Sequence, residues 1–241
     1  MAVSGGRPTR LDKCGRIGKT MLCKFRGALV ASIKELADRI ARDWTEGEYY
    51  REAERSINEQ WSGLIWPIIE GCDFTITLDL AAGHGRNTAK LLKVAGKVIA
   101  VDVNDIAPMR RRFGPDSDHL VLIRNNGFDL SAIADESVTF VYCWDAMVHF
   151  YPEVVRRYIG EFRRIMAPGA RGFVHYSNNH ADPKADYRRH PGWRNYMSRE
   201  IFEGWLKEEG LRPISSFYLK DEIIPADNGD CDAMTLFERP G

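Results

Sequence analysis

Residues 76–94 read Ile-Thr-Leu-Asp-Leu-Ala-Ala-Gly-His-Gly-Arg-Asn-Thr-Ala-Lys-Leu-Leu-Lys-Val, and this stretch decides the fold. A short apolar run leads into a Gly-x-Gly turn at Gly83 and Gly85, and a helical pattern follows. Strand, glycine turn and helix together present backbone N–H groups and the positive end of a helix to a polar cofactor. Asp79 lies within the predicted strand, where its carboxylate would repel a pyrophosphate and attract an ammonium or sulfonium group. The stretch therefore predicts an α/β fold with a site for a cationic cofactor.

The composition is that of a balanced globular chain. Its 241 residues suit one domain with a sizeable core, and 34 basic side chains balance 34 acidic ones, so the chain has no overall nucleic-acid or membrane signature. Five cysteines occur without a Cys-x-x-Cys pair, so neither a zinc knuckle nor a disulfide framework is predicted. No run of 18 apolar residues is present. We expect a cytoplasmic protein with no membrane partner.

Residues 1–28 form a basic leader. Seven Lys or Arg residues occur up to Arg26, and only Asp12 opposes them. Such a segment is typical of a transit peptide or of an arm that binds polyanions. Several glycines and Pro8 interrupt any regular element, so we expect a flexible tail and no nucleic-acid partner.

The rest of the chain divides into two parts. Residues 29–71 contain two amphipathic segments, which we expect to form helices that cover the site. In residues 72–241, short apolar runs alternate with helical patterns, and the last two runs have no helix between them. This order predicts a Rossmann-like, doubly wound and mainly parallel sheet with a C-terminal antiparallel hairpin. The expected strands are 76–80, 98–103, 120–123, 138–143, 172–176, 214–219 and 233–237, and the expected helices among them are 89–94, 106–113, 154–166 and 201–206.

Asp102 ends the second predicted strand, 17 positions after Gly85. An acidic side chain at this point can accept hydrogen bonds from both ribose hydroxyls of a nucleoside cofactor. A nicotinamide dinucleotide is the competing prediction, but it favours a third glycine where this chain has Thr88. Asp79 also disfavours a pyrophosphate, so the spacing favours a nucleoside cofactor that carries a positive charge.

Motifs spread over residues 76–176 resemble those of class I S-adenosylmethionine-dependent methyltransferases. They are the acid that leads into the Gly-x-Gly turn, Val-Asp at 101–102, Asn-Gly-Phe-Asp-Leu at 126–130, Trp-Asp-Ala-Met-Val-His at 144–149 and Met-Ala-Pro-Gly at 166–169. The chain departs from the family pattern in having Ala81 in place of the first glycine and no acid directly beside Gly127. The resemblance implies S-adenosylmethionine as cofactor and S-adenosylhomocysteine as product. It implies cofactor contacts from Asp79, Ala81, Gly83, Gly85, Arg86, Asn87, Asp102, Val103, Asn126, Gly127, Phe128 and Trp144.

Methyl transfer to a hydroxyl needs a group that takes up the proton. The resemblance places His149 towards the substrate, and an imidazole with its ordinary pKa of about 6.5 suits that task. The other catalytic candidates are Asp145 and His175. Contacts with the methyl acceptor are expected from the end of the fifth strand and from the long loop after it, namely from Tyr176, Asn178, Trp193 and Arg194. These groups offer too few carboxylates for a hard metal, so no metal site is expected.

The sequence therefore predicts an enzyme that methylates a small molecule, with a sugar or glycan-type hydroxyl as the first acceptor class. The polar strand end and Trp193 favour that class. N-methylation of a small amine is the first alternative, because an amine can attack without a base. An NAD(P)-dependent oxidoreductase and a non-catalytic or nucleic-acid-binding protein are further alternatives. We expect a monomer or a homodimer.

Overall fold

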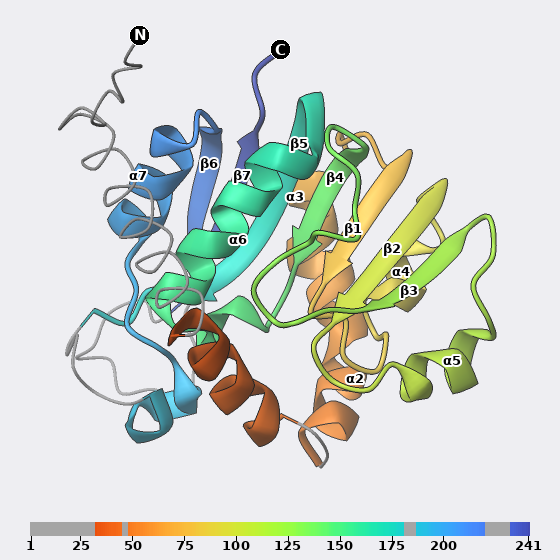
Figure 1. Cartoon of the computed structure of the whole chain (residues 1–241), viewed down its shortest axis with the longest axis horizontal. Helices are drawn as coiled ribbons and strands as arrows, with labels where there is room; N and C mark the ends of the chain where they lie inside the picture. Colours follow the sequence, from red (N-terminus) through yellow and green to blue (C-terminus); the bar gives the residue numbers. More distant parts are fainter. Residues whose placement is uncertain (1–31, 45–47, 181–186, 220–231) are drawn as a thin grey trace, which may run out of the picture.

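A seven-stranded sheet in the order β3-β2-β1-β4-β5-β7-β6 forms the centre of the protein (Figure 1). The computed structural model describes residues 32–44, 48–180, 187–219 and 232–241. Strands β1 to β5 are parallel, and β7 is antiparallel to both β5 and β6. This arrangement confirms the mainly parallel sheet with a C-terminal hairpin. The strands are β1 (Ile76–Leu80), β2 (Lys97–Asp102), β3 (Leu120–Arg124), β4 (Val138–Cys143), β5 (Met166–Ser177), β6 (Arg212–Leu219) and β7 (Asp232–Glu238).

Helices cover both faces of the sheet, as a doubly wound fold requires. Figure 1 shows α6 in front of the sheet and α3 and α4 behind it. One apolar cluster joins the sheet to the helix over residues 32–43, to α6 (Pro152–Ile165) and to α7 (Arg199–Glu208). The second joins the other face to α2 (Glu48–Gln60), α3 (Trp66–Ile69), α4 (Thr88–Leu91) and α5 (Ala107–Phe113). The strands in the middle of the sheet are apolar on both faces because both faces are covered.

A π-helical turn, η1 (Trp61–Ile65), connects α2 to α3. Pro67 explains it, because proline has no N–H to donate to the carbonyl four residues earlier and its ring crowds that carbonyl. The backbone widens instead, and the Trp66 N–H donates to the carbonyl of Trp61. The amphipathic stripe therefore continues through residue 69, and Ile65 and Ile69 are fully buried.

Two element boundaries differ from the sequence prediction by more than two residues. The fifth strand begins at Met166 rather than at residue 172, because Gly169 and Ala170 exchange backbone hydrogen bonds with Arg239 just after β7. The predicted helix over 89–94 ends at Leu91, where the chain turns back so that Lys97 can pair with the residues beside β1. Gly96 fits this close approach, since a Cβ there would lie 2.9 Å from the Thr75 carbonyl oxygen.

Some predictions fall on residues that the structure does not describe. The basic leader, residues 1–28, and the connection between β6 and β7, residues 220–231, lie outside the described residues. Within the described ranges, none of the helices combines the length and the apolar character needed to span a membrane.

Candidate functional site

A cavity of about 740 Å³, counted with its open mouth, lies at the carboxyl ends of β1, β2 and β4. This edge is where open α/β sheets bind ligands. The N-terminal helices close the cavity from the other side. Its lining residues are Ile40, Ala41, Trp44, Tyr50, Glu54, Ala81, Ala82, Gly83, His84, Arg86, Asn87, Asp102, Val103, Asn104, Trp144, Asp145, Ala146, His149 and Phe150.

The glycine turn after β1 forms one wall of the cavity. Ala81, Gly83 and Gly85 all have positive φ, at 57°, 56° and 83°. A Cβ on Gly83 would lie 2.9 Å from the Tyr50 ring, so only glycine lets the backbone and the α2 side chain approach this closely. Gly85 instead packs towards Phe113 and does not line the cavity.

Asp102 at the end of β2 is bound to this turn. Its Oδ2 accepts a hydrogen bond from the Gly83 N–H and its Oδ1 one from the Asn104 N–H, both at 2.8 Å. Burial raises the pKa of Asp102, although these N–H donors oppose the rise. A carboxylate offers about four acceptor positions, so two donors leave room for ribose hydroxyls. Asp102 therefore lies in the cavity in a position suited to bind a ribose.

Asp79 lies beneath the cavity wall rather than in it. It is 1% exposed, and its Oδ2 accepts a hydrogen bond from the Thr88 hydroxyl at 2.6 Å. Burial raises the pKa of Asp79 to about 7. The direct contact with a cationic ligand that the sequence suggested is therefore not seen. The carboxylate instead links β1 to the start of α4.

The turn after β4 brings Asp145 into the cavity opposite Arg86. Nη2 of Arg86 donates to Oδ2 of Asp145 at 2.6 Å. Asp145 has a φ of +54°, and its backbone N–H donates to Nδ1 of His175 at 3.1 Å. His175 is buried and does not line the cavity, so it supports the backbone of Asp145 from behind.

His149, in the 3-10 helix η2 (Met147–His149), lines the cavity with its ring. Its Nδ1 lies 2.7 Å from the Trp193 carbonyl oxygen and therefore carries the proton that it donates to that acceptor. Within the described part of the chain, Nε2 has no hydrogen-bond partner. Burial lowers the pKa of His149 to about 4, against the opposing effect of the Trp193 hydrogen bond. The ring is therefore neutral at pH 7, with an unprotonated Nε2.

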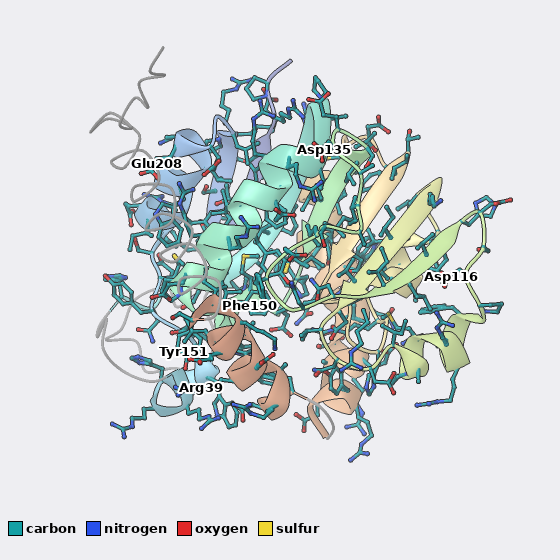
Figure 2. The ribbon with its side chains drawn as sticks, viewed as in Figure 1. Arg39, Asp116, Asp135, Phe150, Tyr151 and Glu208 are labelled. Carbon is teal, nitrogen blue, oxygen red and sulfur yellow. The ribbon has the colours of Figure 1, made fainter. Side chains whose placement is uncertain are left out.

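Residues of the N-terminal helices also lie at the cavity. The Trp44 ring stacks on His149 with 4.2 Å between centroids, and the Trp44 carbonyl accepts hydrogen bonds from the Tyr50 hydroxyl and from Nδ2 of Asn104. Figure 2 shows Arg39, Tyr151 and Phe150 gathered where the helix over residues 32–43 meets the start of α6, and Nη1 of Arg39 donates to the Tyr151 hydroxyl.

The adenine loop predicted after β3 opens onto neighbouring hollows instead of the main cavity. Gly127 lines a small hollow that shares Asp102 and Val103 with the main cavity. Asn126 lines a separate hollow, and its Nδ2 donates to Asp129. Phe128 is buried. Of these three, only Gly127 adjoins the cavity.

The residues expected to touch the methyl acceptor are mostly engaged elsewhere. Tyr176 is fully buried, bonds to the Thr235 hydroxyl and stacks on Phe202, which makes it a core residue. Asn178 accepts a hydrogen bond from the Arg199 N–H at the start of α7. Arg194 is bound to Asp232. Trp193 is 42% exposed and its ring lies edge-on to Trp44 at 5.6 Å, so it is the one that reaches the site.

Several lining or supporting residues escaped sequence reasoning, and three of them are Asn104, Phe150 and Asp232. Asn104 and Phe150 line the cavity, and Asp232 holds the loop of residues 193–195. Asn104 lies two positions after Asp102 and Phe150 directly follows His149, so sequence proximity to a motif could have pointed to them. No motif in the sequence near Asp232 indicated that it has a role at the site. Among the described residues, no group of three His, Cys, Asp or Glu side chains is arranged to hold a metal.

Comparison with known protein families identifies the cavity. Residues 77–169, about two fifths of the chain, match a family model described as a methyltransferase domain. Over these residues the chain is therefore similar to a methyltransferase domain. The match spans β1 to the start of β5, which includes the glycine turn, Asp102 and His149. It decides the choice of cofactor against a nicotinamide dinucleotide. A comparison with curated protein sequences gives no match.

Solved structures share the fold of this chain at low sequence identity. Geranyl diphosphate methyltransferase in complex with S-adenosylmethionine aligns with a TM-score of 0.53 and 15% identity, over 70% of this chain and 79% of that one. The PH0226 protein from Pyrococcus horikoshii OT3 aligns with a TM-score of 0.58 and 17% identity, over 81% and 94%. The [4+2]-cyclase SpnF aligns with a TM-score of 0.58 and 14% identity, over 82% and 86%. At these identities the likeness establishes the fold alone.

The residues of the methyltransferase cavity fit its cofactor. Asp102 offers acceptors for ribose hydroxyls, and the strained glycine turn leaves backbone close to the cavity without a Cβ in the way. Val103, Ile40 and Phe150 supply apolar surface for a nucleoside base. Arg86 can pair with an amino-acid carboxylate, and Asp145 with an ammonium group.

Proposed function

We propose that this methyltransferase transfers the methyl group to a hydroxyl of a small, sugar-type molecule, with His149 as the proton acceptor. The observation that carries the proposal is the state of the His149 ring. Its Nδ1 is engaged by the Trp193 carbonyl, and its Nε2 is buried in the cavity wall without a partner in the described chain. A neutral imidazole held in this tautomer is suited to take a proton from an approaching hydroxyl.

Different residues of the chain contribute to different parts of an in-line methyl transfer. S-adenosylmethionine, when bound, supplies an electrophilic methyl group. Asp102 and the glycine turn orient the cofactor, while His149 binds the hydroxyl of the acceptor and takes its proton at Nε2. Trp44 and Phe150 exclude water around that proton transfer.

The aromatic side chains around His149 favour a sugar ring as acceptor. Trp44 stacks on the imidazole and Trp193 lies against Trp44 with much of its ring exposed, so a flat apolar face is available beside a proton acceptor. An amine acceptor receives less support. The Asp145 carboxylate is already bound by Arg86, which weakens its attraction for a second cation.

The test is methyl transfer from radiolabelled S-adenosylmethionine to a panel of monosaccharides, glycosides and small amines. We expect transfer to a sugar hydroxyl and a loss of about 10²- to 10⁴-fold in kcat for His149→Ala, the usual contribution of a general base. Affinity for S-adenosylhomocysteine should be unchanged in that variant. His119→Ala is the matched control, because His119 is exposed and bonds to the Gly96 carbonyl at the opposite end of β2. Full activity of His149→Ala, or transfer to amines alone, would overturn the proposal.

A further inference from the structure

Asp232 is a buried carboxylate that lies outside the cavity. Two separate series of contacts connect it to residues of the site. It is the first residue of β7, has no exposed surface and pairs across the sheet with Ser177. Arg194 binds it in a bidentate manner, with Nε 3.0 Å from Oδ1 and Nη2 2.6 Å from Oδ2. Nε2 of His175 lies 3.3 Å from Oδ2. Burial alone would raise the pKa of Asp232, but His175 and Arg194 outweigh it and hold that pKa well below its ordinary range.

The first series of contacts runs through Arg194 to His149. Arg194 stands between Trp193 and Asn195, and both neighbours bind the 3-10 helix that carries His149. The Trp193 carbonyl accepts the proton of His149 Nδ1, the Asn195 N–H donates to the Val148 carbonyl at 2.9 Å, and Nδ2 of Asn195 donates to the carbonyl of His149. The ion pair with Asp232 therefore fixes the segment that sets the tautomer of His149.

The second series of contacts runs through His175 to Asp145. Nδ1 of His175 accepts the Asp145 N–H, which leaves the imidazole proton on Nε2, facing Asp232. The same ring stacks on Trp144 at 4.4 Å. This support holds Asp145 in its left-handed conformation, with its carboxylate towards Arg86. The Asp232 carboxylate lies at ion-pair distance from the outer nitrogen of this ring, and its charge favours the ring orientation that turns Nε2 towards it.

We propose that Asp232 is a positioning residue of the methyltransferase, which holds both His149 and Asp145 in their working geometry without touching the cavity. The proposal rests on the proposed role of His149 as base. Its test uses the full-length protein saturated with S-adenosylhomocysteine and labelled with ¹⁵N in its histidines, so that no acceptor is needed. NMR then reports the tautomer and the titration of the His149 ring.

In the wild type we expect the Nδ1–H tautomer and a pKa of about 4. In Asp232→Asn the guanidinium loses its charged partner and residues 193–195 loosen. The ring should become a mixture of tautomers. Loss of the Asp232 charge and loss of the Trp193 hydrogen bond by themselves lower the pKa of His149, so a pKa that rises towards the ordinary value of about 6.5 reports that the ring has become less buried. The charged groups that face His149 are Asp145, Arg194 and Asp232. The double variant Asp232→Asn/Arg194→Gln removes two opposite charges together, so the net charge near His149 is kept. A change in the His149 ring in this variant therefore reports the loss of positioning rather than the loss of a charge. The double variant also keeps the test decisive if the single variant does not fold.

Asp135→Asn is the control, because Asp135 is an exposed carboxylate paired with Arg164 on another part of the surface. An unchanged His149 tautomer and pKa in both Asp232 variants would overturn the positioning role, even if their melting temperatures fell, because a purely structural carboxylate would lower stability alone. The two proposals fail separately. Full methyl transfer by His149→Ala would overturn the base, whereas unchanged rings in the Asp232 variants would overturn only the positioning.

Discussion

Nη2 of Arg86 lies 2.6 Å from Oδ2 of Asp145, and this ion pair joins the turn after β1 to the turn after β4 inside the cavity. The side chains are only 11% and 21% exposed. Breaking a buried pair costs more than forming it contributes, because one charge is left without compensation. The pair therefore specifies how the two turns meet. It also puts opposite charges in the cavity, where the carboxylate of an amino-acid group can pair with Arg86 and its ammonium group with Asp145.

Arg86→Met should lower the free energy of unfolding by about 1–3 kcal/mol, since the Asp145 carboxylate then loses a charge-assisted hydrogen bond in a poorly solvated place. Asp145→Asn alone should cost less, because the amide oxygen still accepts from Arg86. Urea unfolding of both single variants and the double variant measures the coupling. Lys34→Met is the control, because Lys34 and Asp38 form an exposed pair whose loss should change stability by less than about 1 kcal/mol. Equal losses in Arg86→Met and Lys34→Met would contradict the prediction.

Gly83→Ala should weaken the binding of S-adenosylhomocysteine. The φ of +56° costs an alanine about 1–2 kcal/mol, and its methyl group would press on the Tyr50 ring at 2.9 Å. Tyr50 must then move, and its hydroxyl loses the Trp44 carbonyl that it binds at 2.8 Å. We expect calorimetry to show an affinity at least about tenfold lower, which corresponds to about 1.4 kcal/mol. Gly160→Ala is the control, because a Cβ on this α6 residue meets nothing within 4 Å. Identical affinities in the two variants would argue against a tight wall at Gly83.

Asp102→Asn should reduce the affinity for S-adenosylhomocysteine by about 10- to 100-fold, because hydrogen bonds to a charged group contribute about 1.5–3 kcal/mol. Thermal stabilisation by the ligand should fall in parallel. Asp105→Asn serves as control, since Asp105 is exposed and caps the Ala107 N–H in a way that an amide oxygen can retain. Wild-type affinity in Asp102→Asn would show that the ribose lies elsewhere.

Asp79→Asn should remove one contribution to the pH dependence of the free energy of unfolding. The pKa of Asp79 is raised from 3.8 to about 7 by burial, so the folded protein keeps a proton that the unfolded chain releases between these values. The free energy of unfolding of the wild type therefore loses about 3 kcal/mol from this group as the pH rises from 4 to 7. Asparagine does not titrate and can still accept from Thr88.

The stability of Asp79→Asn relative to the wild type should therefore improve steadily over this pH range, as measured by urea unfolding at several pH values. Asp118→Asn, at an exposed position, should show a difference that does not follow this trend. A constant difference between Asp79→Asn and the wild type from pH 4 to pH 7 would mean that Asp79 stays ionised in the folded protein.

Local features of the sequence predicted most of the fold and the edge of the sheet at which the cavity lies. Apolar runs, Asp102 and the glycine turn act through neighbours a few positions away or through one crossover between parallel strands, so their spacing is informative. The boundary of β5 was missed because the pairing of Gly169 with Arg239 joins residues distant in sequence. The position of Asp79 under the cavity wall could not be predicted either, because which side chains of β1 border the cavity depends on how the surrounding elements pack.

The sequence by itself determined the layered α/β architecture, the methyl-donor site and the candidacy of His149, because periodicity and motif spacing encode them within single βα units. Only the tertiary structure decided which polar side chains face the cavity. In the folded protein, His175, Tyr176 and Arg194 lie outside the cavity and bind other residues of the protein. Asp232 of β7 contacts His175 and Arg194, which connect it to Asp145 and His149. The physical reason is that a buried carboxylate must find its partners wherever the packed strands place them, and that placement depends on sheet order.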